Sequence, residues 1–141
     1  MNQSVFVPIN ELENKLVSAL EGNLTGEEFI KRLLLEQVYM PIQDEVHATK
    51  GLQRPSKAQP LLVEDEKGSQ VLILFTSPGR AKEFVDDYPD YGGGLLTDFS
   101  WVLSKLDSPV YVAINPGFDA GFDLHVDIVA DLMSHLPKEI Q

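Results

Sequence analysis

A chain of 141 residues is the length of a single domain, residues 1–141, and its 43% hydrophobic and 23% charged residues are typical of a globular protein with an ordinary core. Its net charge of -11 disfavours binding to nucleic acid and to membranes of anionic lipid, because an acidic surface repels phosphate groups. No apolar stretch is long enough to span a membrane, no signal peptide is recognisable, and the lack of cysteine excludes disulfides and thiol chemistry, so we expect a cytoplasmic protein.

The first part of the chain is predicted to form two helices with capped starts. Asn10 followed by Glu13 is a variant of the capping box, in which the first side chain accepts a hydrogen bond from the helix backbone and the second bonds back to the cap. Leucines at every fourth position then predict a helix over residues 10–21. Thr25 and Glu28 form a second capping box, and the apolar stripe after them predicts a second helix.

The middle of the chain alternates strand and loop patterns. Apolar residues alternate over 38–42, which predicts a strand, and Pro41 places it at a sheet edge because proline has no backbone N–H for a ladder. Such an edge would let two copies of the chain pair, so the sequence also allows a homo-oligomer. Periodicity is lost over 44–59, which we interpret as a long loop. The runs 61–63 and 71–75 predict an antiparallel hairpin, with the second run apolar on both faces as in a central strand.

Helices and strands are predicted to alternate after the hairpin. Ser77 is placed to cap a helix that Pro89 ends. The glycine run 92–94 predicts a flexible joint, and Thr97 is placed to cap the next helix. A second apolar strand is expected over 110–114.

The last part of the chain is predicted to contain a turn, a short strand and a helix. Residues 115–117 have the composition of a turn, and Phe122 and Leu124 alternate as in a strand. Asp127 is placed to cap the final helix, with Ile128 on its buried side. With the elements before it, this order predicts an α+β fold: a small mixed β-sheet with an N-terminal hairpin and helices packed on the sheet.

Four polar residues near the end of the chain are candidates for a metal site. If residues 123–127 were extended, Asp123, His125 and Asp127 would point to one face, and Asp119 lies shortly before them. Such a group would serve a small metal-assisted hydrolase or a ligand-binding protein that uses Asp119, Asp123 and His125. The spacing matches no established metal pattern, so the simpler interpretation is a polar turn with Asp127 as a helix cap, and we expect no metal and no cofactor.

The preferred function is a non-enzymatic protein-binding or regulatory module, because no nucleophile and base can be paired from the sequence and no catalytic residue is predicted. Its binding surface would join the loops that follow the two apolar strands. The predicted members are Ser77, Arg80, Asn115, Gly117, Phe118, Asp119 and Phe122. The two aromatic residues would form an apolar contact inside an acidic rim, although the simpler interpretation of both is packing in the core. Acidic residues dominate between Glu83 and Asp131, which favours a basic protein partner or simply a well-solvated surface.

Several of these residues, taken in order, resemble one protein family. They are Phe75-Thr76-Ser77 with Ala81 and Phe84 downstream, Trp101, the turn Ile114-Asn115-Pro116-Gly117, and the closing stretch 122–132. In this arrangement residues 10–136 resemble the N-terminal domain of SseB family proteins, a bacterial family named for enhanced serine sensitivity. The resemblance implies a cytosolic bacterial α+β domain without a settled biochemical activity, and therefore without catalytic residues to transfer. Longer members of the family carry a second, C-terminal domain, so the resemblance concerns their first domain.

Overall fold

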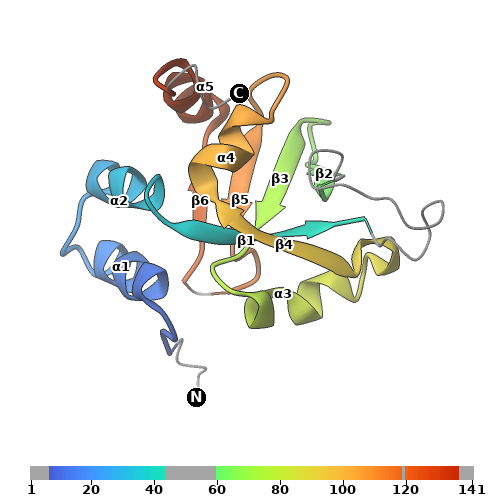
Figure 1. Ribbon diagram of the computed structural model, residues 1–141, viewed down its shortest axis with the longest axis horizontal. Helices are drawn as coiled ribbons and strands as arrows, with labels where there is room; N and C mark the ends of the chain where they lie inside the picture. Colours follow the sequence, from blue (N-terminus) through green and yellow to red (C-terminus); the bar gives the residue numbers. More distant parts are fainter. Residues whose placement is uncertain (1–6, 44–59, 119, 137–141) are drawn as a thin grey trace.

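The computed structural model describes residues 7–43, 60–118 and 120–136, so the loop predicted over 44–59 lies outside the described residues. The helices are α1 (Glu11–Leu20), α2 (Gly26–Leu33), α3 (Pro78–Val85), α4 (Phe99–Ser104), α5 (Val126–Ser134) and the short 3-10 helix η3 (Pro89–Tyr91). The strands are β1 (Gln37–Ile42), β2 (Leu62–Glu64), β3 (Gln70–Leu74), β4 (Gly93–Asp98), β5 (Tyr111–Ile114) and β6 (Phe122–Leu124) (Figure 1). None of these helices is both long and apolar enough to cross a membrane.

The strands form two sheets. β2, β3, β5 and β6 lie side by side in that order, with β3 and β5 parallel and the two outer pairs antiparallel. β2 and β3 form the predicted hairpin, and β1 and β4 form a separate antiparallel ribbon. This ribbon crosses the end of the larger sheet (Figure 1), where Tyr39 exchanges backbone hydrogen bonds of 2.8 and 2.9 Å with Phe75. The helices and the mixed sheet confirm the predicted α+β fold, with the strands divided between two sheets.

Apolar side chains cover both faces of β3. Leu72 and Leu74 belong to the larger core cluster, which side chains of α1, α2, α4 and α5 complete. Ile73 and Phe75 face the opposite side and pack with Ala81 of α3 in a smaller cluster. Because neighbouring side chains of a strand point to opposite faces, β3 is the covered central strand that its apolar sequence predicts.

Both predicted helix starts at the N-terminal end are confirmed. Asn10 Oδ1 accepts a hydrogen bond of 2.8 Å from the Glu13 N–H, and Thr25 and Glu28 form a complete reciprocal capping box. One half of the first box differs, because the Glu13 carboxylate accepts from the Ile9 N–H at 3.0 Å instead of from the cap residue. This carboxylate is turned into the protein, where the residue is fully buried.

The predictions of a flexible joint at 92–94 and of a helix capped by Thr97 are wrong. β4 begins within the glycine run and continues through Thr97, and the N-cap of α4 is Asp98. A Cβ on Gly94 would overlap the ring of Tyr39, which lies over it. Glycine is needed here so that an aromatic ring can approach the strand backbone, and in sequence this use cannot be distinguished from a flexible joint.

β1 is not a free edge, contrary to the prediction from Pro41. β4 pairs along one side of it, and on the other side Tyr39 pairs with Phe75 and the Pro41 carbonyl accepts from the Leu61 N–H at 3.1 Å. Alternate residues of a strand direct their backbone groups to opposite edges, so Pro41 shares the side of Tyr39, away from β4. The missing N–H of the proline therefore leaves the ladder with β4 intact, and the expected basis for pairing two copies through β1 is removed.

Of two other predicted helix caps, one is confirmed in position and one is wrong. Ser77 is the N-cap residue of α3, as predicted, although its hydroxyl makes no capping hydrogen bond. α5 begins after His125, whose Nδ1 accepts from the Asp127 N–H at 3.1 Å, so Asp127 lies inside the helix. The helix buries Val129, whereas Ile128, predicted on the buried side, is 39% exposed.

Candidate functional site

A reciprocal pair of side chains joins the loops after the parallel strands β3 and β5. The Thr76 N–H donates to Asn115 Oδ1 at 3.0 Å, and Asn115 Nδ2 donates to Thr76 Oγ1 at 2.8 Å. Asn115 Nδ2 also donates to the Ala120 carbonyl at 3.2 Å, and the backbone of Asn115 is left-handed with a φ of 57°. Asparagine tolerates that conformation better than most residues, so one side chain both shapes the turn and attaches it to the neighbouring strand end.

Glu13 of α1 reaches the same strand end. Its carboxylate accepts hydrogen bonds from Thr76 Oγ1 at 2.6 Å, from Arg80 Nε at 3.0 Å and from Arg80 Nη2 at 2.8 Å. Burial alone raises the pKa of this carboxyl, but Arg80 through its hydrogen bonds and charge, the Thr76 hydroxyl and the Ile9 N–H outweigh it, so the pKa lies below its ordinary value of 4.5. We call Glu13, Thr76, Arg80 and Asn115 the strand-end cluster.

Arg80 closes this cluster toward the surface. Its Nη2 donates to the Val7 carbonyl at 2.6 Å, and its guanidinium carbon lies 5.7 Å from the centre of the Phe118 ring. Three predicted site residues, Arg80, Asn115 and Phe118, are therefore brought together. The polar side chains of the cluster bond to one another and to the backbone, and Glu13 and Asn115 are fully buried. Such paired, buried groups stabilise the junction of α1, α3 and the two strand ends.

A cavity of about 430 Å³ lies beside the turn between β5 and β6. Among its lining residues are the predicted site residues Asn115, Gly117, Phe118 and Phe122, while Asp119 lies outside the described residues. Gly121 also lines the cavity, and a Cβ there would lie 3.0 Å from the Asn115 carbonyl oxygen and 3.2 Å from that of Phe118. The tight turn therefore depends on a glycine whose role the sequence pattern does not indicate.

Ser77, the remaining predicted member of the surface, lies at a different cavity. That cavity, of about 400 Å³, is bounded by the starts of α1 and α3 and includes Leu35 and Leu96 in its lining. Ser77 is 5% exposed, and its hydroxyl has no hydrogen-bond partner among the described residues. The two leucines are 87% and 53% exposed. Ser77 therefore lines a different cavity from the loop residues with which it was predicted to act.

The metal candidates in the described residues do not all lie together: Asp123 and His125 line a common cavity of about 400 Å³, and Asp127 does not line it. β6 ends and α5 begins within residues 123–127, so the extended conformation that would align Asp123, His125 and Asp127 is absent. His125 Nδ1 lies 3.6 Å from an Asp127 carboxylate oxygen. In the described ranges, which leave out Asp119, no group of three acidic or histidine residues is arranged to hold a metal ion.

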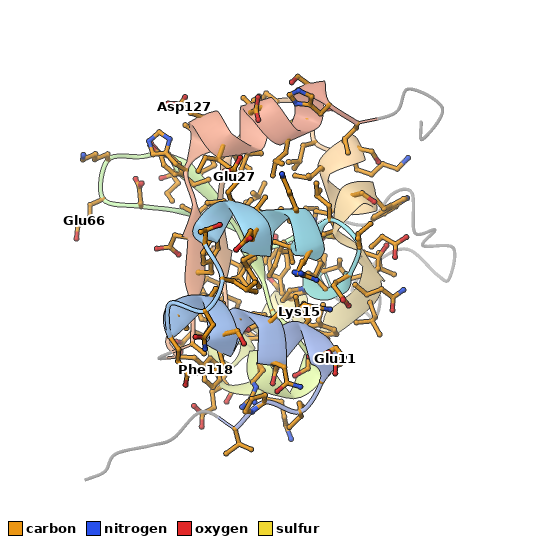
Figure 2. All side chains as sticks on the ribbon, turned by 90° about the vertical axis from the view of Figure 1, so that its left-hand side faces the viewer. Glu11, Lys15, Glu27, Glu66, Phe118 and Asp127 are labelled. Carbon is orange, nitrogen blue, oxygen red and sulfur yellow. The ribbon has the colours of Figure 1, made fainter. Side chains whose placement is uncertain are left out.

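A groove of about 570 Å³ lies between α2 and α5. Because its lining is apolar and its charged residues are mostly carboxylates, we call it the acidic groove. Its apolar lining is Ile30, Phe122, Ile128 and Leu132, and its charged lining is Glu27, Asp127, Asp131 and the single base Lys31. The ring of Phe122 meets the buried Phe29 edge to face, with ring centres 4.9 Å apart. The side chains of Asp127 and Asp131 are 89% and 71% exposed. Figure 2 shows Glu27 on α2 and Asp127 on α5 on the same side of the molecule.

Of this groove the sequence patterns single out Phe122, Asp127 and Ile128, each for a reason other than a groove. The sequence feature that could have indicated the groove is a pair of adjacent apolar residues in each helix: Ile128 precedes Val129, and Ile30 follows Phe29. One member of each pair packs into the core, and the other is left at the groove. An apolar stripe wider than one buried face is therefore the feature that marks such a helix surface.

The chain matches the family model described as SseB protein N-terminal domain over residues 12–131. This stretch runs from α1 into α5 and so contains the strand-end cluster and most of the acidic groove. No curated protein and no solved structure matches the chain.

Proposed function

The chain belongs to the SseB family, and we propose that this domain is a non-enzymatic module that binds a basic protein segment in the acidic groove between α2 and α5. The observation that carries the proposal is an apolar lining bordered by exposed carboxylates from two neighbouring helices. An amphipathic helix would place its apolar side in the groove, while its Lys and Arg side chains pair with the carboxylates.

The apolar lining supplies the affinity. Ile128 is 39% exposed, and covering it together with Ile30 would remove apolar surface from water, worth about 25 cal/mol per Å² before the costs of association. Phe122 is already held by its edge-to-face contact with Phe29, so this part of the groove needs little rearrangement on binding. An apolar patch with a charged border is the usual anatomy of a protein-binding surface.

The charges decide the class of partner. Glu27, Asp127 and Asp131 face the same groove as a single base, Lys31, and the whole chain carries a net charge of -11. These charges attract a basic segment during association and repel an acidic one, and the attraction weakens as salt is added. The neutral apolar lining alone would not discriminate between the two.

The test uses two labelled helical peptides of about 15 residues with the same leucine stripe. One carries lysines on its polar side, and the other carries glutamates at the same positions. We expect the lysine peptide to bind, with an affinity that falls as salt is raised, and the glutamate peptide not to bind. Fluorescence anisotropy measures both affinities, and amide chemical shifts should move on α2 and α5.

A matched pair of variants locates the site. Ile128→Glu introduces a charge into the groove and should abolish binding of the lysine peptide. Ile9→Glu makes the same change at another exposed isoleucine, which is 65% exposed and lies outside the groove, and should leave the affinity unchanged. Equal affinity of the Ile128→Glu variant and the unchanged protein, or of the two peptides, would contradict the proposal.

A further inference from the structure

We propose that the outer edge of β4 is a second binding site, at which an extended segment of a partner protein adds as a further β-strand. β4 pairs with β1 on one side, and no other strand of the described residues pairs with it. A strand with one unpaired side presents a row of N–H and C=O groups that a second extended chain can match. Among the described residues, the free edge of this ribbon is thus β4, and not the β1 strand that contains proline.

The direction of the backbone groups in β4 follows from its partner. Tyr39 of β1 exchanges both of its backbone hydrogen bonds with Phe75, on the side away from β4. The backbone N–H and C=O groups of the residues next to Tyr39 therefore point toward β4. Leu95 pairs with one of these residues, so its own backbone groups point back toward β1. Gly94 and Leu96, on either side of Leu95, consequently direct their N–H and C=O groups to the outer edge.

These outward groups are free in the described residues and accessible. No hydrogen bond from another described residue reaches the backbone of Gly94 or Leu96. Gly94 is exposed, and because glycine has no side chain its exposed surface is backbone. Two residues of a strand that face the same edge are about 7 Å apart, a spacing that an extended chain reproduces and a helix does not.

The side chains beside this edge specify the chemistry of the segment. Leu96 lines the cavity of about 400 Å³ together with the exposed Leu35 and with Glu11. Cross-strand neighbours on one face contact each other, so the partner residue opposite Leu96 is apolar and fills the space against Leu35. Asp98 is exposed two residues further along the same face of β4, so the partner residue opposite it is Lys or Arg. The site therefore fits an extended segment in which an apolar residue and a basic residue stand two positions apart, on the same face of the segment.

This site is separate from the acidic groove. The groove is lined by residues of α2, β6 and α5, and none of them lines the cavity beside Leu96. Binding at β4 is therefore expected to survive Ile128→Glu, and binding in the groove is expected to survive a change at β4. A failure of either proposal can be recognised without reference to the other.

The experiment uses one extended peptide with lysine and valine at alternating odd positions and threonine at every even position. In strand addition the lysine and valine residues lie opposite Asp98 and Leu96, and their N–H groups point to β4. N-methylation of these residues should weaken binding by about tenfold or more, whereas N-methylation of the threonines should leave it unchanged. The two methylated peptides have the same composition, so they control for each other while the protein stays unaltered.

Amide hydrogen exchange gives the second measurement. On binding of the parent peptide, exchange of the Gly94 and Leu96 amides should slow, and exchange of the Leu95 amide, already paired with β1, should not change. Equal affinities of the two methylated peptides, or unaltered exchange at Gly94 and Leu96, would overturn the proposal. So would a concentration-dependent dimer in which both amides are protected without peptide, because a second copy of the chain would then occupy the edge.

Discussion

Arg80 donates two hydrogen bonds to the carboxylate of Glu13, one of 2.8 Å from Nη2 to Oε1 and one of 3.0 Å from Nε to Oε2. Glu13 is fully buried, and the side chain of Arg80 keeps 18% exposure. The two residues belong to the first and third helices, so their contact joins α1 to α3, the helix that follows the central strand β3. A bidentate pair of this kind fixes the orientation of both groups as well as their separation.

Removing the base from this pair should destabilise the protein strongly. Arg80→Met keeps an unbranched apolar stem but leaves the buried carboxylate of Glu13 without its charge partner, which costs about 3–5 kcal/mol in comparable pairs. Urea unfolding at neutral pH measures the change in the free energy of unfolding. The double variant Arg80→Met with Glu13→Gln no longer buries an unpaired charge and should recover part of the loss. A double variant no more stable than Arg80→Met alone would contradict this account.

The same pair predicts how stability depends on pH. Folding lowers the pKa of Glu13 below its ordinary value of 4.5, so the ionised carboxylate stabilises the folded state. This contribution is complete above the unfolded pKa and is lost as the pH falls through the lower folded pKa. The advantage of the unchanged protein over Glu13→Gln should therefore be largest near pH 6 and should shrink toward about pH 3, as urea unfolding at a series of pH values would show. A difference that stays constant over this range would rule out Glu13 as the titrating group.

Local signals in the sequence predicted the parts of the fold that local contacts determine. The starts of α1 and α2 follow from Asn10 and Thr25, because a capping side chain bonds within its own first turn. The prediction for β4 was wrong because Gly94 is required by the ring of Tyr39, which lies on the neighbouring strand. Without knowing which strands pair, a glycine under an aromatic ring has the same sequence signature as a glycine in a joint.

The candidate sites were predictable to a similar extent. Arg80 and Asn115 were expected together because each follows an apolar strand, and the parallel pairing of β3 with β5 does end the two strands at the same edge of the sheet. Glu13 was not expected there, because its place in a capping box already explained it locally and its partner is distant in the sequence. The acidic groove depends on how α2 and α5 lie next to each other, which no local pattern of Ile30 or Ile128 contains.

Gly94→Ala tests whether Tyr39 is the reason for the glycine in β4. The added methyl group would overlap the ring, so the free energy of unfolding should fall by roughly 1–3 kcal/mol, the usual cost of overpacking. Gly79→Ala is the matched control, because nothing lies within 4 Å of a Cβ at that helical position and the change should be neutral or stabilising. Thermal and urea unfolding compare the two variants. Equal stability of Gly94→Ala and the unchanged protein would show that the ring does not require glycine at this position.

The turn after β5 offers a test that separates backbone conformation from hydrogen bonding. Asn115→Gly and Asn115→Ala both remove the amide that bonds to Thr76 and to the Ala120 carbonyl, so both should be less stable than the unchanged protein. Alanine must also hold the left-handed φ of 57°, at a cost of about 1–2 kcal/mol that glycine avoids.

Glycine in turn loses more freedom on folding, by roughly 0.5–1 kcal/mol, so the glycine variant should be the more stable of the two by about 0.5–1 kcal/mol. Urea unfolding of both variants side by side measures this difference directly. If the alanine variant were instead the more stable of the two by about 0.5–1 kcal/mol, the left-handed backbone would contribute nothing to the choice of asparagine, and the hydrogen bonds of Asn115 to the β3 strand end would account for it alone.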